Sequence, residues 1–183
     1  MFRRSKMREE LAGLAFHRDS LRYVQSDRRE RISLPEGPDG DLEPAFLDLR
    51  KRLGGFRCPV VLGIPARDVK FDVFHYPRMP LSDVRDSLIL DFEDHFSFPW
   101  SEAVLDVAEV NSLERERRDE KGMTVLAAVS RRAWIDSALA AARRAGLPIR
   151  AVEPMSVAFL RSLATEAGEL QDGAYLAVWV GPG

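Results

Sequence analysis

Three histidines and one cysteine are the residues of this chain best suited to bind a transition metal. Their predicted positions differ: a turn for His17, a strand end for His75 and a helix end for His95. Cys58 has no second thiol or nearby imidazole to join. A zinc site needs three or four convergent ligands, so the sequence predicts no metal site of this kind.

A weaker cation site is conceivable on one predicted helix. Asp91, Asp94 and His95 follow each other at positions i, i+3 and i+4, which places them on one helix face. Acidic residues on the solvent side of an amphipathic helix need no further explanation, and we favour that simpler interpretation.

The sequence motifs of covalent and phosphoryl-transfer chemistry are absent. The chain has no Gly-x-Ser-x-Gly and no Cys/His pair at a recognisable spacing, although a Ser-His-Asp set could still assemble in space. It has neither Gly-x-Gly-x-x-Gly nor Gly-x-x-x-x-Gly-Lys, and its terminal Gly-Pro-Gly precedes no helix. We therefore predict no catalytic residue and no bound cofactor.

The composition is that of an ordinary globular protein. With 183 residues, of which 45% are hydrophobic and 31% charged, the chain can bury one core or two small lobes. A net charge of −2 argues against nucleic-acid binding, and a single cysteine excludes an internal disulfide and fits a reducing cytoplasm. Neither a signal peptide nor a membrane span is recognisable, so we expect a soluble protein.

The elements that must position any site begin with a hairpin. Residues 11–16 and 20–25 read as two strands around a polar turn, and residues 32–34 as a further short strand. A helix is predicted from Leu42 to Leu53, and Gly54 supplies its stop. A short buried strand, PVVLGIP, follows.

Residues 67–130 predict a strand, a helix and two more strands. Val69, Phe71 and Val73 alternate with polar residues, which predicts a half-buried strand with these apolar side chains inside. Ser82 is expected to cap the helix, and Pro99 to end it. The apolar stripe of this helix consists of Leu81, Val84, Leu88, Phe92 and Phe96.

The remaining elements complete an α/β order. Ser130 is expected to cap a helix that Gly146 closes, and a short strand and a second helix follow before AYLAVWV, Ala174 to Val180. We predict an α/β fold whose first subdomain contains residues 1–66 and 131–172. An inserted strand-helix-strand-strand subdomain would contain residues 67–130, and residues 173–183 would begin a second lobe.

Four aromatic side chains are the candidate partner-binding residues: Phe74, Tyr76, Phe98 and Trp100. They sit at the ends of strands that flank the insert's helix, and at least some are expected on a face that the Val/Leu core does not use. One interpretation is that all four close a seam between the insert and the outer subdomain. The other is an aromatic-lined groove for a peptide, because aromatic residues are enriched at interfaces.

Three segments resemble the N-terminal half of the PilM family, actin-like cytoplasmic proteins of type IV pilus assembly. The first is VVLGIPARDVKFDVFHYPRMP, with its strand and Pro-x-Met-Pro turn. The second is LSDVRDSLILDFEDHFSFPWSEAVLDV, a helix that ends in a Phe-Pro corner and returns as a strand. The third is the strand-helix segment ARRAGLPIRAVEPMSVAFLRSL. Their order and spacing carry the resemblance.

The resemblance implies an actin-like, ribonuclease H-like subdomain with an inserted subdomain, within an inner-membrane platform. Family members bind the cytoplasmic tail of a membrane-anchored partner, PilN, in a groove between the two subdomains, and they bind ATP. Here Ala15 and His17 stand where the family has Asp-x-Gly, and Trp179 stands where another Asp is expected, although Gly181 is kept. Without the metal-holding carboxylates, we expect neither ATP binding nor enzyme activity.

These observations together predict a non-enzymatic assembly scaffold, cytoplasmic and held at the inner membrane through the tail of a PilN-like partner. A component of a related type II secretion or competence platform is the first alternative, and an actin-like ATPase is the second. The strand Ala174 to Val180 is expected to pair with another copy, as a homodimer, or to fold onto the first lobe, because an open apolar edge invites strand addition.

Overall fold

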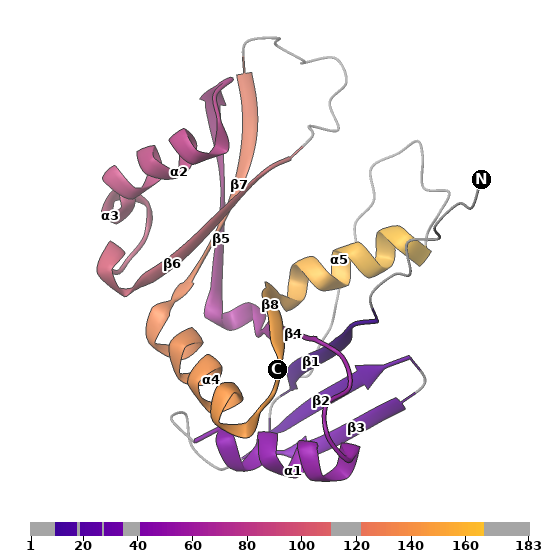
Figure 1. The fold of residues 1–183 in the computed structure, drawn as a ribbon. Helices are drawn as coiled ribbons and strands as arrows, with labels where there is room; N and C mark the ends of the chain where they lie inside the picture. The colour runs from indigo at the N-terminus through magenta and orange to yellow at the C-terminus, as the bar shows by residue number, and fades with distance from the viewer. Residues whose placement is uncertain (1–9, 18, 27, 35–40, 111–121, 167–183) are drawn as a thin grey trace, which may run out of the picture. The chain divides into compact units, whose positions relative to one another are not determined.

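The computed structural model describes residues 10–17, 19–26, 28–34, 41–110 and 122–166 of the chain (Figure 1). The chain divides into two compact units: unit 1 contains residues 1–66 and 138–183, and unit 2 contains residues 67–137. The predicted strand Ala174 to Val180 and Trp179 lie outside the described residues. The same holds for most of the charged loop predicted between the last two strands of the insert.

Unit 1 is built on a five-stranded sheet in the order β3-β2-β1-β4-β8. The strands are β1 (Ala12–His17), β2 (Ser20–Gln25), β3 (Arg28–Ser33), β4 (Val60–Ile64) and β8 (Ile149–Pro154). The first three pair antiparallel, whereas β4 lies parallel to both β1 and β8. The predicted hairpin is confirmed, and the third strand is longer than predicted.

Three helices accompany this sheet: α1 (Glu43–Leu53), α4 (Arg132–Ala145) and α5 (Met155–Glu166). Gly54, with φ of 68°, adopts the left-handed conformation that ends α1, as the sequence predicts, and Gly146, with φ of 71°, follows α4. The chain passes from unit 2 back to unit 1 within α4. None of the helices in the described ranges is both long and apolar enough to span a membrane.

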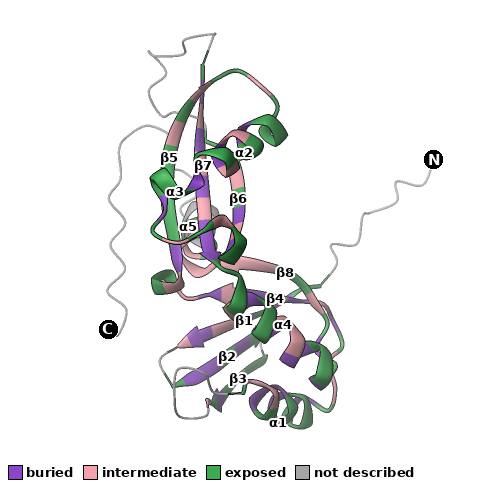
Figure 2. Ribbon diagram, turned by 90° about the vertical axis from the view of Figure 1, so that its left-hand side faces the viewer, coloured by how far each residue is buried: buried purple, intermediate pink, exposed green. Residues whose placement is uncertain are grey.

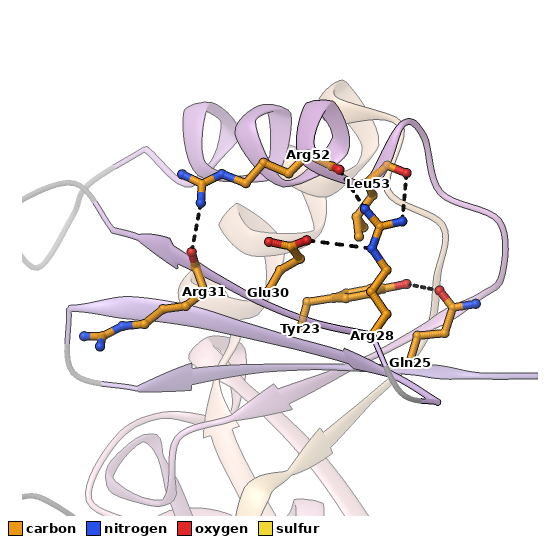
Figure 3. A network of polar contacts seen from close by, with 7 residues as sticks. All are labelled: Tyr23, Gln25, Arg28, Glu30, Arg31, Arg52 and Leu53. Carbon is orange, nitrogen blue, oxygen red and sulfur yellow. Dashed lines mark hydrogen bonds and ion pairs between the residues drawn. The ribbon is translucent and has the colours of Figure 1, made fainter.

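An arginine holds the end of α1 against the edge strand of the sheet (Figure 3). The Arg28 guanidinium donates to the backbone oxygens of Arg52, at 2.7 Å, and Leu53, at 3.1 Å. Glu30 lies 3.7 Å from the same guanidinium. Because the last carbonyls of a helix have no intrahelical donor, this cation satisfies two of them and also complements the helix dipole.

Unit 2 is a three-stranded antiparallel sheet in the order β5-β7-β6, with α2 and α3 connecting β5 to β6. Its elements are η1 (Ala66–Asp68, shared with unit 1), β5 (Val69–Pro77), α2 (Leu81–Leu90), α3 (Phe92–His95), η2 (Trp100–Glu102), β6 (Ala103–Glu109) and β7 (Gly122–Arg131). The α/β fold class with a strand-helix-strand-strand insert is confirmed.

The core of unit 2 lies between one face of its sheet and the helices. It comprises Val84, Leu88, Phe92, Phe96, Ala103, Leu105, Met123, Val125, Ala127 and Val129. Figure 2 shows this burial along β7. Four of the five residues in the predicted helical stripe are therefore buried, and only Leu81 is exposed.

The predicted inner face of β5 is correct for Val69, which is buried, and wrong for Phe71 and Val73. Val73 is 51% exposed and Phe71 is 38% exposed, whereas Phe74 and Tyr76 pack against the core. In the antiparallel register, Phe74 lies opposite Val125 of β7, and both side chains face the helices. The strand carries apolar residues on both faces: Phe71 and Val73 on one, Phe74 and Tyr76 on the other. The helices pack on the second face, so Phe74 and Tyr76 are the residues that contact the core.

The predicted helix between residues 82 and 99 is also shorter and interrupted. It breaks at Asp91 into α2 and α3, and α3 ends at His95, before Pro99. Ser82 is not its cap, because Pro80 occupies the N-cap position and the Ser82 hydroxyl donates to Asp83. Likewise the Ser130 hydroxyl donates to the Asp68 backbone oxygen at 2.8 Å, so it holds β7 to the start of β5.

Candidate partner-binding site

Phe92 is the centre of an aromatic cluster at the corner that connects α3 to β6. It is only 1% exposed. Its ring centroid lies 5.9 Å from that of Phe98 and 5.4 Å from that of Trp100, both edge to face, and 4.8 Å from that of Phe96. Such contacts stabilise ring pairs beyond simple area burial, so Phe92 fixes the positions of the two outer rings.

Two cations flank the Phe98 ring. The Arg131 guanidinium carbon lies 4.7 Å from the ring centroid, and Lys70 Nζ lies 5.9 Å from it. Lys70 also donates to Ser97 Oγ at 2.6 Å, and Arg131 forms an ion pair with Glu102 at 2.8 Å. The ring is half-buried, and its remaining surface is bordered by positive charge.

Phe74 and Tyr76 lie on the helix-facing side of β5, with ring centroids 6.4 Å apart. The His95 ring meets Phe74 edge to face at 4.9 Å. Burial, and secondarily the charge of Asp91, raise the pKa of Tyr76 above its ordinary value. The Tyr76 hydroxyl therefore stays neutral near pH 7, as a polar group at the rim of the core.

A small hollow of about 180 Å³ opens beside this cluster. It is lined by Ile89, Leu90, Asp91, Phe92, Glu93, Asp94 and Trp100. Leu90 is 85% exposed, which is unusual for a large apolar side chain at the end of a helix. The hollow is too small for a drug-sized ligand, but it can receive one side chain of a peptide.

The four predicted aromatic residues are brought together by one core. Phe74, Tyr76, Phe98 and Trp100 are all half-buried and all pack against the buried cluster of unit 2. The expectation that some of them lie on a face away from that core is wrong. For Phe74 and Tyr76 the reason is the parity of β5, since these two residues share a face with Val125 and Met123 of β7.

Sequence reasoning missed two residues that shape this corner. Leu90 follows Leu88 by two positions, so it falls off the apolar stripe of α2, and that displacement was the available signal. His95 was considered only as a metal ligand, whereas its ring packs on Phe74. Within the described residues, no three His, Cys, Asp or Glu side chains converge in a way that could hold a metal ion.

In unit 1, the carboxyl ends of the parallel strands are where a phosphate would approach in an α/β protein. Ala15, Gly63 and Glu153 lie side by side in the register of β1, β4 and β8. The Glu153 carboxylate is paired with Arg161 at 2.5 Å, and a Cβ added at Gly63 would meet Met155 Cγ at 2.9 Å. The Met155 side chain therefore packs directly over Gly63.

The hairpin end carries a histidine and an arginine, but its described residues include no carboxylate cluster that could hold a metal ion. His17 lies opposite Ser20, and its Nδ1 is 3.5 Å from the Arg22 guanidinium. No free carboxylate stands beside Ala15 in the described residues of this sheet end. The residues present do not fit a metal-bound nucleotide phosphate.

No protein-family model and no curated protein matches the chain. Solved structures do match it. A structure of a PilM-PilN type IV pilus biogenesis complex superposes with a TM-score of 0.73 and 22% sequence identity, over 87% of this chain and 52% of that chain. This chain therefore spans about half the length of the protein it matches there.

The cytoplasmic domain of EpsL, an inner-membrane component of the type II secretion system of Vibrio cholerae, matches with a TM-score of 0.57 and 12% identity. That match covers 79% of this chain and 57% of the EpsL chain. A Bacteroides thetaiotaomicron protein described as having an actin-like ATPase fold covers 91% of this chain and 60% of its own, at 11% identity. Its TM-score of 0.44 is too low to bear on the fold.

At these identities the likeness shows the fold alone. The prediction of a PilM-like α/β fold is confirmed by the first structure. The chain is also similar in fold to a cytoplasmic domain of a secretion component.

Proposed function

We propose that this protein is a non-enzymatic assembly scaffold of a type IV pilus-like inner-membrane platform. It binds the cytoplasmic tail of a PilN-like membrane protein and is held at the cytoplasmic face of the membrane by that partner. The observation that carries this proposal is the fold shared with the PilM-PilN complex, at a TM-score of 0.73 over 87% of the chain.

The aromatic corner of unit 2 supports the binding part of the proposal. Phe74, Tyr76, Phe98 and Trp100 each keep part of their ring surface accessible while the core fixes their positions. Rigid, half-buried aromatic rings provide contact area at a small cost in side-chain entropy, and such rings are common hot spots. The hollow between Trp100 and Leu90 can receive a side chain of the bound tail.

The absence of catalysis is supported by the carboxyl edge of unit 1. Ala15 and His17 replace the acidic and glycine positions that the family uses for its nucleotide, and Met155 packs over Gly63. We expect the purified protein to hydrolyse no ATP above the background of a buffer control. ATP turnover that is lost on a substitution in this edge, such as His17→Ala, would instead identify an actin-like ATPase.

The binding site can be tested with a synthetic peptide of a PilN-like cytoplasmic tail and isothermal titration calorimetry. Phe98→Ala and Trp100→Ala should each weaken binding by about 2 kcal/mol or more, as for hot-spot residues. The matched control is Phe71→Ala, which removes an exposed ring from the opposite face of the same sheet. Circular dichroism of each variant checks that it is folded.

Equal affinity for the parent and for folded Phe98→Ala and Trp100→Ala would show that these rings are structural only. Weakening by Phe71→Ala alone would move the site to the other face of the sheet. If the peptide binds neither the parent nor any variant, a PilN-like tail is not the partner.

A second candidate is a component of a type II secretion platform, favoured by the fold shared with the EpsL cytoplasmic domain at a TM-score of 0.57. The same calorimetry with cytoplasmic segments of type II secretion membrane proteins separates the two. Tighter binding of those segments than of the PilN-like tail would select this candidate.

A further inference from the structure

The sheet of unit 2 has two outer strands, β5 and β6, and no described strand of the unit pairs with the outer edge of either. Both strands carry the same local feature. The Val73 N–H donates to Asp72 Oδ1 at 2.8 Å, and the Val107 N–H donates to Asp106 Oδ1 at 3.0 Å. In each strand, an aspartate thus binds the backbone N–H of the residue that follows it.

The strand register places both N–H groups on the outer edges. In an antiparallel pair, successive residues alternately face the partner strand and face away from it. The Val110 N–H donates to Thr124 O of β7 at 2.9 Å, so the odd-numbered Val107 faces away from β7. Asp72 and Val107 are both opposite Ala127, which can face only one neighbour, so Asp72 faces β7 and Val73 faces outward.

The β5 edge is well suited to unwanted pairing. β5 is 9 residues long, Val73 is its central residue, and Phe71 and Val73 are exposed beside the open edge. Long, apolar, unpaired edges are templates for strand addition between copies. The edge of β6 is shorter, at 7 residues, but it is equally without a neighbour among the described strands of unit 2.

We propose that Asp72 and Asp106 protect the two edges of the unit 2 sheet against pairing with a second copy of this chain. Each carboxylate occupies the outward N–H that an added strand needs, and it also places a negative charge at the edge. An incoming strand must break this hydrogen bond and leave the carboxylate without its donor, which opposes addition. The inference concerns self-association and does not depend on the proposed partner.

Self-association of full-length variants, measured by sedimentation velocity over a wide range of concentration, tests this inference. Asp72→Ala with Asp106→Ala should raise the self-association constant about tenfold or more over the parent, since an outward donor is freed at each edge. Both side chains are exposed, so the fold should persist, and circular dichroism checks this.

Two further variants separate the hydrogen bond from the charge. Asp72→Asn with Asp106→Asn keeps an oxygen that can accept from the N–H, so it should associate clearly less than the double alanine variant. Asp86→Ala removes one exposed carboxylate of α2, away from both edges, and should also behave like the parent. Amide hydrogen exchange at Val73 and Val107, measured in dilute solution, should quicken in the alanine variant only.

The proposal is overturned if the double alanine variant associates no more than the parent and Asp86→Ala. It is also overturned if the asparagine variant associates as strongly as the alanine variant, because charge alone would then be responsible. Unchanged amide exchange at Val73 and Val107 in the alanine variant would show that the two hydrogen bonds are not formed in solution.

Discussion

The core of unit 1 and the aromatic corner of unit 2 differ in how completely their largest side chains are buried. Tyr23 and Phe46 of unit 1 are almost completely buried, and Met155 packs directly on Gly63. In unit 2, Phe92 is equally buried, but Phe98 and Trp100, which contact it, remain half-exposed. The large rings of the unit 1 core are therefore covered completely, whereas the burial of the rings in the unit 2 corner is graded.

This difference is the reason why we place the proposed partner-binding site in unit 2. A fully buried ring can contribute only to stability, whereas a ring fixed from below and exposed above can also contribute to recognition. At the strand ends of unit 1, Met155 packs over Gly63. The binding site that we propose lies instead at the corner of unit 2.

The largest expected effect comes from the centre of the graded cluster. Phe92→Ala should reduce the free energy of unfolding by about 3–5 kcal/mol, because it removes a buried ring and leaves a cavity under Phe98 and Trp100. Urea unfolding followed by tryptophan fluorescence measures it, with exposed Phe71→Ala as the control. If the two variants lose the same stability, the corner is not supported by Phe92 and the comparison fails.

A titration of unit 1 tests how completely its large side chains are buried. Burial first, and then the Cys58 thiol, raise the pKa of Tyr23 to about 12, from the usual value near 10. A raised pKa means that the stabilising contribution is complete below about pH 10 and is lost as pH rises through about 12. The parent should lose about 2–3 kcal/mol over this range relative to Tyr23→Phe. If the free energies of unfolding of the parent and of Tyr23→Phe change with pH in the same way, Tyr23 ionises as an exposed tyrosine does.

The filled edge of unit 1 is tested at Gly63. Gly63→Ala should cost about 1–2 kcal/mol, since the new methyl group overlaps Met155 Cγ. Gly13→Ala in the neighbouring strand is the control, because a Cβ there meets nothing within 4 Å. Adding Met155→Ala to Gly63→Ala should recover part of the loss. Equal melting temperatures for Gly63→Ala and Gly13→Ala would mean that this edge is open after all.

The smallest effect is expected at the rim of unit 1. Arg28→Ala should cost about 1 kcal/mol, because the guanidinium binds two terminal carbonyls of α1 but is partly exposed. Arg29→Ala, an exposed position of the same strand, is the control and should be neutral within about 0.5 kcal/mol. Thermal unfolding compares the two. If Arg29→Ala loses as much stability as Arg28→Ala, the effect comes from the change in net charge and not from the contacts with α1.

Local signals in the sequence predicted most of unit 1 and the element order of unit 2. The hairpin follows from alternation around a polar turn, and the end of α1 follows from the conformational freedom of Gly54. The order strand, helix, strand, strand was also predictable from periodicity. These features depend on neighbours in sequence, and they need no knowledge of tertiary contacts.

The predictions were wrong where a contact between residues distant in sequence determines the local structure. Phe71 and Phe74 are both apolar residues of β5, and only the position of α2 and α3 determines which of them is inside. Ser130 has the residue type of a helix cap, yet its hydroxyl bonds Asp68, which is distant in sequence. The four aromatic candidates were identifiable by type, but the support of Phe98 and Trp100 by Phe92 was not.

Val69 pairs with Ser130 in the ladder between β5 and β7, and the Ser130 hydroxyl reaches Asp68. The start of β5 and the end of β7 are thus hydrogen-bonded to each other at one end of the unit 2 sheet. Inserting such a module into unit 1 costs little loop-closure entropy, because the two ends of the module already lie close together.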